Sequence, residues 1–458
     1  MSRFKPIKRE MNYLFPPSMH DWLPEQHLAR FIVEIVEPLD VKPMERASGT
    51  RGSAPFHPAL LPSILVYGYA TGVFSSRNLE HATYDSVAFR FVAADEHPDH
   101  DTLNTFRKRF LKEIEGLMVQ GLMIARTMGV LKLGNIALDG SKLNANASKH
   151  RALSYGHIKQ LDVQLQGEVT TLMELAEAAD NETIPDGMNL PEEITRRGDR
   201  LKAIAAATIK IEQHAKERFE QEPADYQAKL DTRAAKSRDR GKPARGTRPV
   251  PPVEGARDKD QINLTDEESR IMKVSGGGFD QCYNGQLAVD MDHMLIVTTD
   301  TVQACNDTQQ VAPILKQLKA LPGELGQPVH LVADTGDFSE ANVKACGEQA
   351  MTPLIAMKRE AHHLDPLARW ADPPPLKEDA TEVERMRQGL LTRAGRALYA
   401  KRKCTVEPVI GIIKAIGGFR QFSLRGLEHV KGEWNLVAMA WNVKRMFVLA
   451  GSCRAATA

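Results

Sequence analysis

The sequence predicts a mixed α/β protein, with an all-α region at its N-terminus and a sheet-containing domain after it. Three observations predict this class. Apolar residues recur at helical spacing from about residue 57 to residue 130. Short apolar runs typical of buried strands begin near residue 134 and resume near residue 280. Two long helical stripes lie between these strand regions, which indicates a helical insertion into the sheet domain.

The overall composition is that of a folded protein with more than one domain. A chain of 458 residues exceeds one ordinary core, and its 42% hydrophobic and 26% charged residues are typical of globular proteins. No run is long and apolar enough to cross a bilayer, and the N-terminus lacks the apolar core of a signal peptide. The five cysteines form no CxxC pair, which indicates reduced thiols rather than a zinc site. We therefore expect a cytoplasmic protein with no membrane partner.

The first 130 residues are predicted to be helical after an irregular start. Several prolines between residues 1 and 50 limit helix length there. Pro58 suits the first turn of the next helix, and Ser75 or Ser76 can cap the one after it. Asp101 is the predicted N-cap of a third helix.

A basic cluster lies on this third helix. Leu103 and Phe106 belong to its apolar stripe, and Arg107, Lys108 and Arg109 are predicted to lie on the opposite face. Several short helices that end in a basic one resemble a helix-turn-helix module, so these three residues are candidate nucleic-acid contacts. A solvated basic face on a small helical bundle explains them about as well.

The helical insertion follows the first predicted strand, which ends at Asp139-Gly140. Leu161 and Leu165 belong to one helical stripe, and Ile204 and Ile211 belong to a second, so an αα-hairpin is predicted. Residues 232–262 are rich in Arg, Lys, Pro and Gly and nearly free of large apolar side chains. That composition predicts an exposed, mobile linker.

Strands and helices alternate after the triple glycine at residues 276–278. The sequence pattern predicts a hairpin, a helix, a buried strand, a helix capped by Ser339, a further strand and a helical C-terminus. The corresponding ranges are 281–303 for the hairpin, 308–321 for the helix, 328–334 for the buried strand, and 352–357 for the last strand.

Two of the predicted strands end in a carboxylate. Asp139 lies in ALDGSKLNANAS and Asp334 in LVADTGDFSEAN, and each follows an apolar run. Ligands of α/β sheets bind at such strand ends, and folding could bring the two acids together. An acid followed by glycine is also a common turn former, which explains Asp139-Gly140 well and Asp334 less well.

A third acid, Glu407, lies in the segment YAKRKCTVEPVIGIIK. On one continuous helix, Tyr399, Lys403, Glu407 and Lys414 would share a face, which suits a metal ligand flanked by phosphate-binding cations. Pro408 disfavours helical geometry at Glu407, so the helix is predicted to be kinked or to begin there. The alternative is an amphipathic helix with solvated charges on its outer face.

Together these segments resemble the DDE-type transposases of bacterial insertion sequences. The resemblance covers nearly the whole chain and is strongest in DGSKLNANASKH, in ADTGDFSE and from Tyr399 to Arg445. It implies an RNase H-like catalytic domain in which Asp139, Asp334 and Glu407 are the catalytic residues and hold two Mg²⁺ (or Mn²⁺) ions. Such a protein cleaves DNA at the ends of an insertion sequence and joins them to target DNA.

The family's Tyr–Arg–Glu–Lys motif corresponds here to Tyr399, Arg402, Glu407 and Lys414. Two departures are visible. The usual Arg-to-Glu interval is one residue shorter, which would select Lys403 as the phosphate-holding cation, so both cations stay candidates. Asp337 stands where an aromatic residue is common, and it is a possible additional metal ligand.

The resemblance also implies the domain organisation and the partners. Residues 1–130 would form a helical DNA-binding domain, 131–152 and 263–458 the two parts of the catalytic domain, and 153–262 the inserted hairpin and linker. The expected partner is double-stranded DNA, both element ends and target, bound by a homodimer or higher oligomer in the nucleoid. An RNase H-like nuclease without strand transfer, or an inactive DNA-binding regulator, is the alternative.

Overall fold

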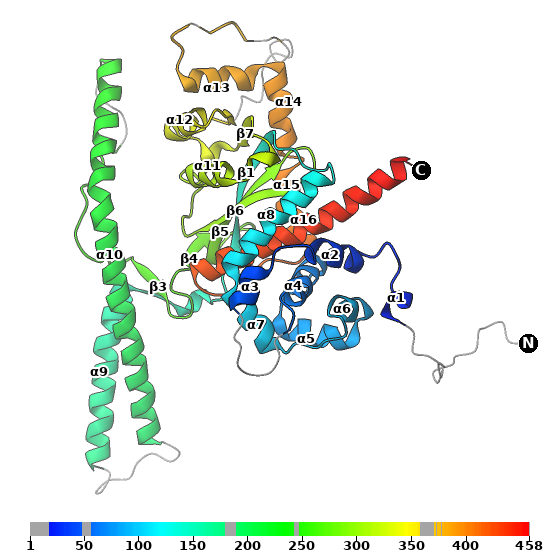
Figure 1. Ribbon diagram of the computed structural model, residues 1–458. Helices are drawn as coiled ribbons and strands as arrows, with labels where there is room; N and C mark the ends of the chain where they lie inside the picture. Colours follow the sequence, from blue (N-terminus) through cyan, green and yellow to red (C-terminus); the bar gives the residue numbers. More distant parts are fainter. Residues whose placement is uncertain are drawn as a thin grey trace, which may run out of the picture. The chain divides into compact units, whose positions relative to one another are not determined.

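A computed structural model describes residues 18–47, 56–178, 189–241, 247–357, 371, 373–376 and 378–457. The chain divides into two compact units. The first consists of Met1–Asn146 with Met272–Ala458, and the second is Ala147–Ile271. The chain is of the mixed α/β class with a helical N-terminal region, as predicted (Figure 1).

The first unit is built on a mixed six-stranded sheet. Its central strand β1 pairs with β7 in parallel and with β5 in antiparallel orientation, and β5 and β6 form the predicted hairpin. The order along the sheet is β4-β5-β1-β7-β8, and β6 also pairs with β5. The strands are β1 Asn135–Asn144, β4 Arg270–Lys273, β5 Phe279–Asp290, β6 Ile296–Val302, β7 His330–Ala333 and β8 Thr352–Ile355.

Helices cover both faces of this sheet. Neighbouring residues of β6 show the alternation, because Thr298 bonds to Gln317 of α11 and Thr299 bonds to Asn435 of α16. Helix α11 (Val311–Ala320) packs beside α12 (Glu340–Glu348), which Ser339 caps as predicted. Helix α16 (Leu427–Thr457) packs on the other face, where Trp434 is fully buried and donates to the backbone of β5.

The N-terminal helices pack on α16, so they belong to the same compact unit as the sheet. Helices α4 and α8 make the main contacts, and Lys444 of α16 donates to the Ala70 carbonyl at the end of α4. The helices are α1 Met19–Trp22, α2 Leu28–Val36, α3 Lys42–Ala47, α4 Leu60–Thr71, α5 Ser76–Asp85, α6 Val87–Val92, α7 His100–Arg109 and α8 Leu111–Thr127.

Two predictions about α7 are wrong. Its N-cap is Asp99 rather than Asp101, because the Asp99 carboxylate accepts from the Thr102 amide at 2.6 Å. Arg107 does not face solvent, because it follows Leu103 by four residues and therefore lies on the buried face of the helix.

A polar network pairs the terminal nitrogens of the buried Arg107, whereas its Nε has no hydrogen-bond partner among the described residues. Its guanidinium donates to the Tyr69 hydroxyl at 2.8 Å and to the Phe74 carbonyl at 3.2 Å. Glu433 of α16, which is fully buried, lies 3.8 Å away and accepts from the same Tyr69 hydroxyl. Burial of a cation is tolerated here because a carboxylate and several acceptors surround it. Lys108 and Arg109 are exposed, as predicted.

The second unit is a helical pair with a short two-stranded sheet. Helices α9 (Tyr155–Ala178) and α10 (Leu190–Arg240) pack on each other, and β2 (Ala152–Ser154) pairs with β3 (Gln261–Asn263). The apolar contacts come from both predicted stripes and from β3. They are formed by Ile158, Leu161, Leu165, Ile204, Ala207, Ile211 and Ile262.

The prediction of a mobile linker over 232–262 is wrong for most of that range. Residues 232–240 are the last turns of α10, and Ile262 of β3 is buried. Ion pairs hold the returning chain to α10, with Arg218 bonded to Asp260 and Arg257 bonded to Glu222, each at 2.8 Å. Ion pairs, rather than an apolar core, therefore hold this segment against α10. Residues 242–246 lie outside the described residues.

None of the helices in the described part of the chain combines the length and apolar character needed to cross a bilayer.

Candidate active site

Asp139 lies in the middle of β1, not at its end as predicted. The strand continues to Asn144 because β5 pairs with it throughout, for example Gly140 with Gln286. On the other side the pairing with β7 stops at Ala137 and Val332. The Asp139 carboxylate therefore lies where the parallel neighbour ends, with 21% of its side chain exposed.

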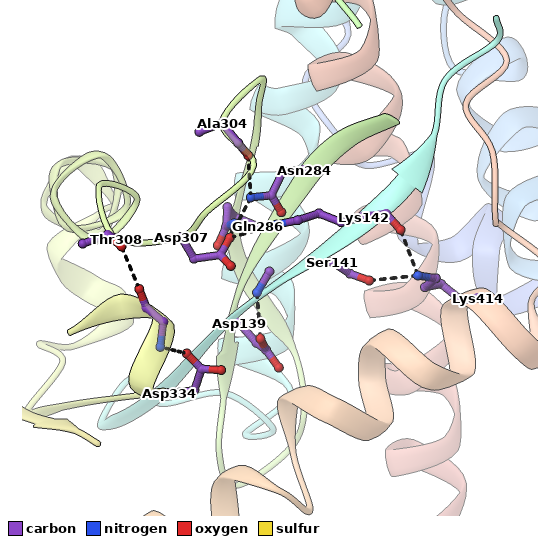
Figure 2. A network of polar contacts seen from close by, with 12 residues as sticks. Asp139, Ser141, Lys142, Asn284, Gln286, Ala304, Asp307, Thr308, Asp334 and Lys414 are labelled. Carbon is purple, nitrogen blue, oxygen red and sulfur yellow. Dashed lines mark hydrogen bonds and ion pairs between the residues drawn. The ribbon is translucent and has the colours of Figure 1, made fainter. Parts of the chain in front are cut away.

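Asp334 directly follows β7. Its carboxylate accepts from the Gly336 amide at 2.6 Å and closes the turn Thr335–Asp337 (Figure 2). Thr308, from the segment before α11, donates to the Gly336 carbonyl at 3.0 Å and so stabilises this turn. Because Ala137 pairs with Val332, two residues further along each strand bring Asp139 and Asp334 to neighbouring positions. The structure therefore brings Asp139 and Asp334 to neighbouring positions, where the parallel pairing of β1 with β7 ends.

Glu407 comes from a new helix rather than a continuous one. Helix α14 (Arg393–Arg402) ends before α15 (Val406–Gly411), so the prediction of one shared face from Tyr399 to Lys414 is wrong. Of the two predicted outcomes, a kink or a helix start at Glu407-Pro408, the structure shows the second. Both residues lie in the first turn of α15, where the N–H that proline lacks would have no intrahelical partner. A π-helical turn, Ile412–Ile416, follows α15 and contains Lys414.

Arg402 joins two of the acids. Its guanidinium contacts the Asp139 carboxylate at 3.3 Å and the Glu407 carboxylate at 2.9 Å. The Arg402 side chain is 8% exposed, whereas that of Glu407 is 44% exposed. Burial alone would lower the pKa of Arg402, but the neighbouring Asp139, Tyr399 and Glu407 raise it. The guanidinium therefore acts as the counter-charge for the acids.

This geometry distinguishes the two candidate cations. Arg402 lies among the acids, whereas Lys403 is exposed in the segment between α14 and α15. Tyr399 is half-buried one turn before Arg402. Burial raises the pKa of the Tyr399 hydroxyl, and Arg402 opposes the shift through its charge and a hydrogen bond.

Lys414 lies beside the next residues of β1. Its ammonium donates to the Ser141 hydroxyl and to the Lys142 carbonyl, each at 2.9 Å (Figure 2). Both acceptors are neutral, so the positive charge of Lys414 is not cancelled by these contacts. Burial lowers the pKa of this ammonium.

Asp337 is almost completely buried, with 1% of its surface exposed. Burial, reinforced by the charges of Asp334, Asp307 and Asp139, raises the pKa of the Asp337 carboxyl to about 8. Its Oδ1 has no hydrogen-bond partner among the described residues. Burial and the neighbouring acids therefore favour the protonated form of the Asp337 carboxyl near neutral pH.

Sequence reasoning missed a second polar cluster, on the opposite face of β1. One carboxylate oxygen of Asp307 accepts from Asn284 and from Gln286, each at 2.6 Å, and lies 3.5 Å from the Lys142 ammonium (Figure 2). Gly140 provides the necessary space, because a Cβ there would come within 2.7 Å of this Asp307 oxygen. The available signal was the spacing of Asn284 and Gln286, two polar residues that lie on the same face of strand β5.

The donor set of the three acids suits a hard divalent cation, because all three offer carboxylate oxygens. Burial raises the pKa of Asp139 to about 6; the charges of Asp334 and Glu407 add to this increase, and Arg402 opposes it. A cation between the acids would relieve that repulsion. Among the described residues no three His, Cys, Asp or Glu side chains are already arranged as a metal site. Instead, the positive charge of Arg402 partly balances the negative charges of Asp139 and Glu407.

Two family models match the chain. Residues 17–109 match a family described as "Transposase domain (DUF772)", and residues 376–447 match one described as "Transposase DDE domain". The second match contains Arg402, Glu407 and Lys414. No curated protein and no solved structure matches the chain. The two matches, one near each end of the chain, support an insertion-sequence DDE transposase, and the acid-bearing mixed sheet lies between them in the sequence.

Proposed function

We propose that the protein is an active DNA transposase that cuts insertion-sequence ends and joins them to target DNA, on an RNase H-like catalytic domain. One observation supports this most directly. Asp139, Asp334 and Glu407, from three distant segments, gather at one edge of the sheet, where Arg402 contacts two of them. Three like charges gathered at one place, with a cation already among them, indicate a site for a positively charged group.

Asp139, Asp334 and Glu407 would hold two Mg²⁺ or Mn²⁺ ions. When bound, such ions supply an activated oxygen nucleophile and stabilise the oxygen that leaves the phosphate. In the first reaction water attacks a phosphodiester bond at the element end, and a 3′-hydroxyl leaves. In the second, this 3′-hydroxyl attacks a target phosphate, and a target 3′-oxygen leaves with the proton. No covalent bond to the protein forms in either reaction.

The basic residues around the acids would hold the DNA backbone. Arg402 can exchange its carboxylate partners for a phosphate, because a guanidinium offers several donors in a fixed plane. Lys414, whose ammonium has only neutral acceptors among the described residues, can attract a second phosphate. Lys403 is exposed beside them, and Tyr399 could stack on a terminal base.

The partner would be duplex DNA, bound by two or more copies of the chain when both ends of an element are held together. Lys108 and Arg109 on α7 are exposed and suit backbone contacts, which position DNA without reading its sequence. Removing one such contact lowers the slope of log affinity against log salt concentration by about 1.

A strand-transfer assay tests this function. Purified protein is incubated with Mg²⁺, labelled duplexes taken from the DNA that flanks its gene, and a supercoiled target plasmid. Labelled products joined to the plasmid support the proposal. Nicked duplex without joining would indicate a nuclease, and a gel shift without any cleavage would indicate a DNA-binding regulator. Either of these outcomes would refute strand transfer.

A further inference from the structure

Helices α4 and α5 are connected as in a helix-turn-helix. The turn Gly72–Ser75 joins them, and Gly72 adopts a left-handed conformation with φ of 86°. Two helices joined by a turn of three or four residues that contains glycine are typical of this motif, in which the second helix enters the major groove. Every residue from Leu61 to Ala70 is buried, so α4 is the supporting helix. Helix α5 lies at the rim of the helical region (Figure 1).

One face of α5 carries exposed polar side chains. Arg77, His81 and Tyr84 follow each other at spacings of four and three residues, and Asn78 borders them. Only Leu79 and Thr83 of this helix are buried, and they lie on the opposite face. In the part of the chain that the structure describes, the side chains of Arg77 and Asn78 form no hydrogen bond or ion pair. Their donors and acceptors are therefore available to a ligand.

These side chains match the edges of DNA bases. Arginine donates two hydrogen bonds to guanine, and asparagine pairs with adenine through one donor and one acceptor. Tyr84 is 55% exposed and is held rigid by stacking on His97, with ring centroids 4.0 Å apart. A rigid aromatic at the end of such a face can contact a thymine methyl group or the sugar beside it.

The turn before α5 is anchored to the catalytic layer. Arg107 donates to the Phe74 carbonyl at 3.2 Å, and the Phe74 ring meets Phe419 edge-to-face at 5.2 Å. A Cβ on Gly72 would lie 3.1 Å from the Gly417 carbonyl, so the turn touches the chain just after the π-helical turn that contains Lys414. DNA held by α5 would therefore be held in a fixed relation to the strand and helix that carry the acids.

We infer that α5 reads the sequence of the element end in the major groove, through Arg77, Asn78 and His81. The basic end of α7, which was the first candidate, then contributes only backbone contacts through Lys108 and Arg109. This inference rests on the proposed function, because it names the site by which the same protein would select its DNA. It adds a sequence-reading surface that is separate from the acids.

Fluorescence anisotropy with two labelled duplexes tests it. One duplex is taken from the DNA that flanks the gene, and the other has the same base pairs in shuffled order. The specificity ratio is the affinity for the first divided by the affinity for the second. Arg77→Ala and Asn78→Ala should each lower this ratio by about 5- to 150-fold, as expected for the loss of one base-reading pair. Lys112→Ala, an exposed cation on α8, is the matched control and should leave the ratio unchanged.

The double variant Lys108→Ala/Arg109→Ala should weaken binding to both duplexes equally and reduce the salt slope by about 2. If an alanine variant on α5 melts earlier than the wild type, Arg77→Lys and Asn78→Gln, which keep polarity at exposed positions, replace it in the comparison. An unchanged ratio in the α5 variants, or equal binding of both duplexes by the wild type, would overturn the inference. Wild-type discrimination without any Mg²⁺-dependent cleavage would instead refute the proposed function and leave α5 as the reading helix.

Discussion

Replacing Asp337 with asparagine should make the protein more stable above about pH 4, and the gain should grow with pH. The pKa of this carboxyl is raised from 3.8 to about 8 in the folded protein, chiefly by burial. Well below pH 4 the Asp337 carboxyl is protonated in both the folded and the unfolded chain, so it does not lower the free energy of unfolding. Between pH 4 and pH 8 the unfolded chain releases the proton while the folded chain keeps it, so stability falls as pH rises.

The size of the effect follows from the shift. Each unit of pKa difference corresponds to about 1.4 kcal/mol, so a difference of about four units gives a penalty of roughly 5 kcal/mol at pH 8. Asparagine has the same shape and no charge, so Asp337→Asn removes this penalty. The difference in unfolding free energy between variant and wild type should therefore be near zero at pH 4 and reach several kcal/mol at pH 8.

Urea denaturation followed by circular dichroism, with a chelator present, measures this difference at several pH values. Asp101→Asn is the matched control, because its side chain is 88% exposed, and it should change stability by little at any pH. A difference between Asp337→Asn and wild type that stays constant from pH 4 to pH 8 would show that Asp337 is ionised in the folded protein. The assignment of a neutral acid beside the site would then be wrong.

Three further substitutions probe the framework of the site. Arg107→Met should cost about 3–5 kcal/mol of unfolding free energy, because it leaves the buried carboxylate of Glu433 without its cation. In urea denaturation, the added substitution Glu433→Gln should restore part of this loss. Additive losses in the double variant would contradict the pairing of Arg107 with Glu433. Gly140→Ala should cost about 1–3 kcal/mol in the same assay, since its Cβ would come within 2.3 Å of a buried amide. Gly167→Ala, on an exposed stretch of α9, should instead raise the free energy of unfolding by up to ~1 kcal/mol. Equal effects of Gly140→Ala and Gly167→Ala would refute the crowding at Gly140. Arg402→Gln should shift the acid limb of the pH–rate profile to higher pH, because the guanidinium lowers the pKa of the carboxyl on β1, and an unmoved limb would exclude that role.

The sequence was informative where a residue's role depends on its own strand or helix. Apolar runs located β1 and β7, and Pro408 marked the start of the helix that carries Glu407. Helical spacing located the hairpin of α9 and α10. These features are local, so periodicity and turn chemistry are sufficient to predict them.

The errors arose where distant segments decide the environment. Arg107 resembles a surface cation until Glu433, more than 300 residues later, provides its partner. Asp307 packs against the other face of β1 because Gly140 leaves room for it and β5 provides two amides. The basic segment after residue 232 is ordered by ion pairs with α10, which composition alone does not reveal. Partners of this kind become visible only when the chain is folded.

The central claim is that Asp139, Asp334 and Glu407 hold the catalytic cations, and a metal-specificity switch tests it most directly. Each acid is replaced in turn by cysteine, and joining of labelled end DNA is measured in Mg²⁺ and in Mn²⁺. A thiolate is a poor ligand for Mg²⁺ and a better one for Mn²⁺, so each variant should be inactive in Mg²⁺ and recover in Mn²⁺. Asp337→Cys, beside the site, should show no such switch. Mg²⁺-dependent joining by Asp139→Ala, Asp334→Ala or Glu407→Ala would contradict the assignment.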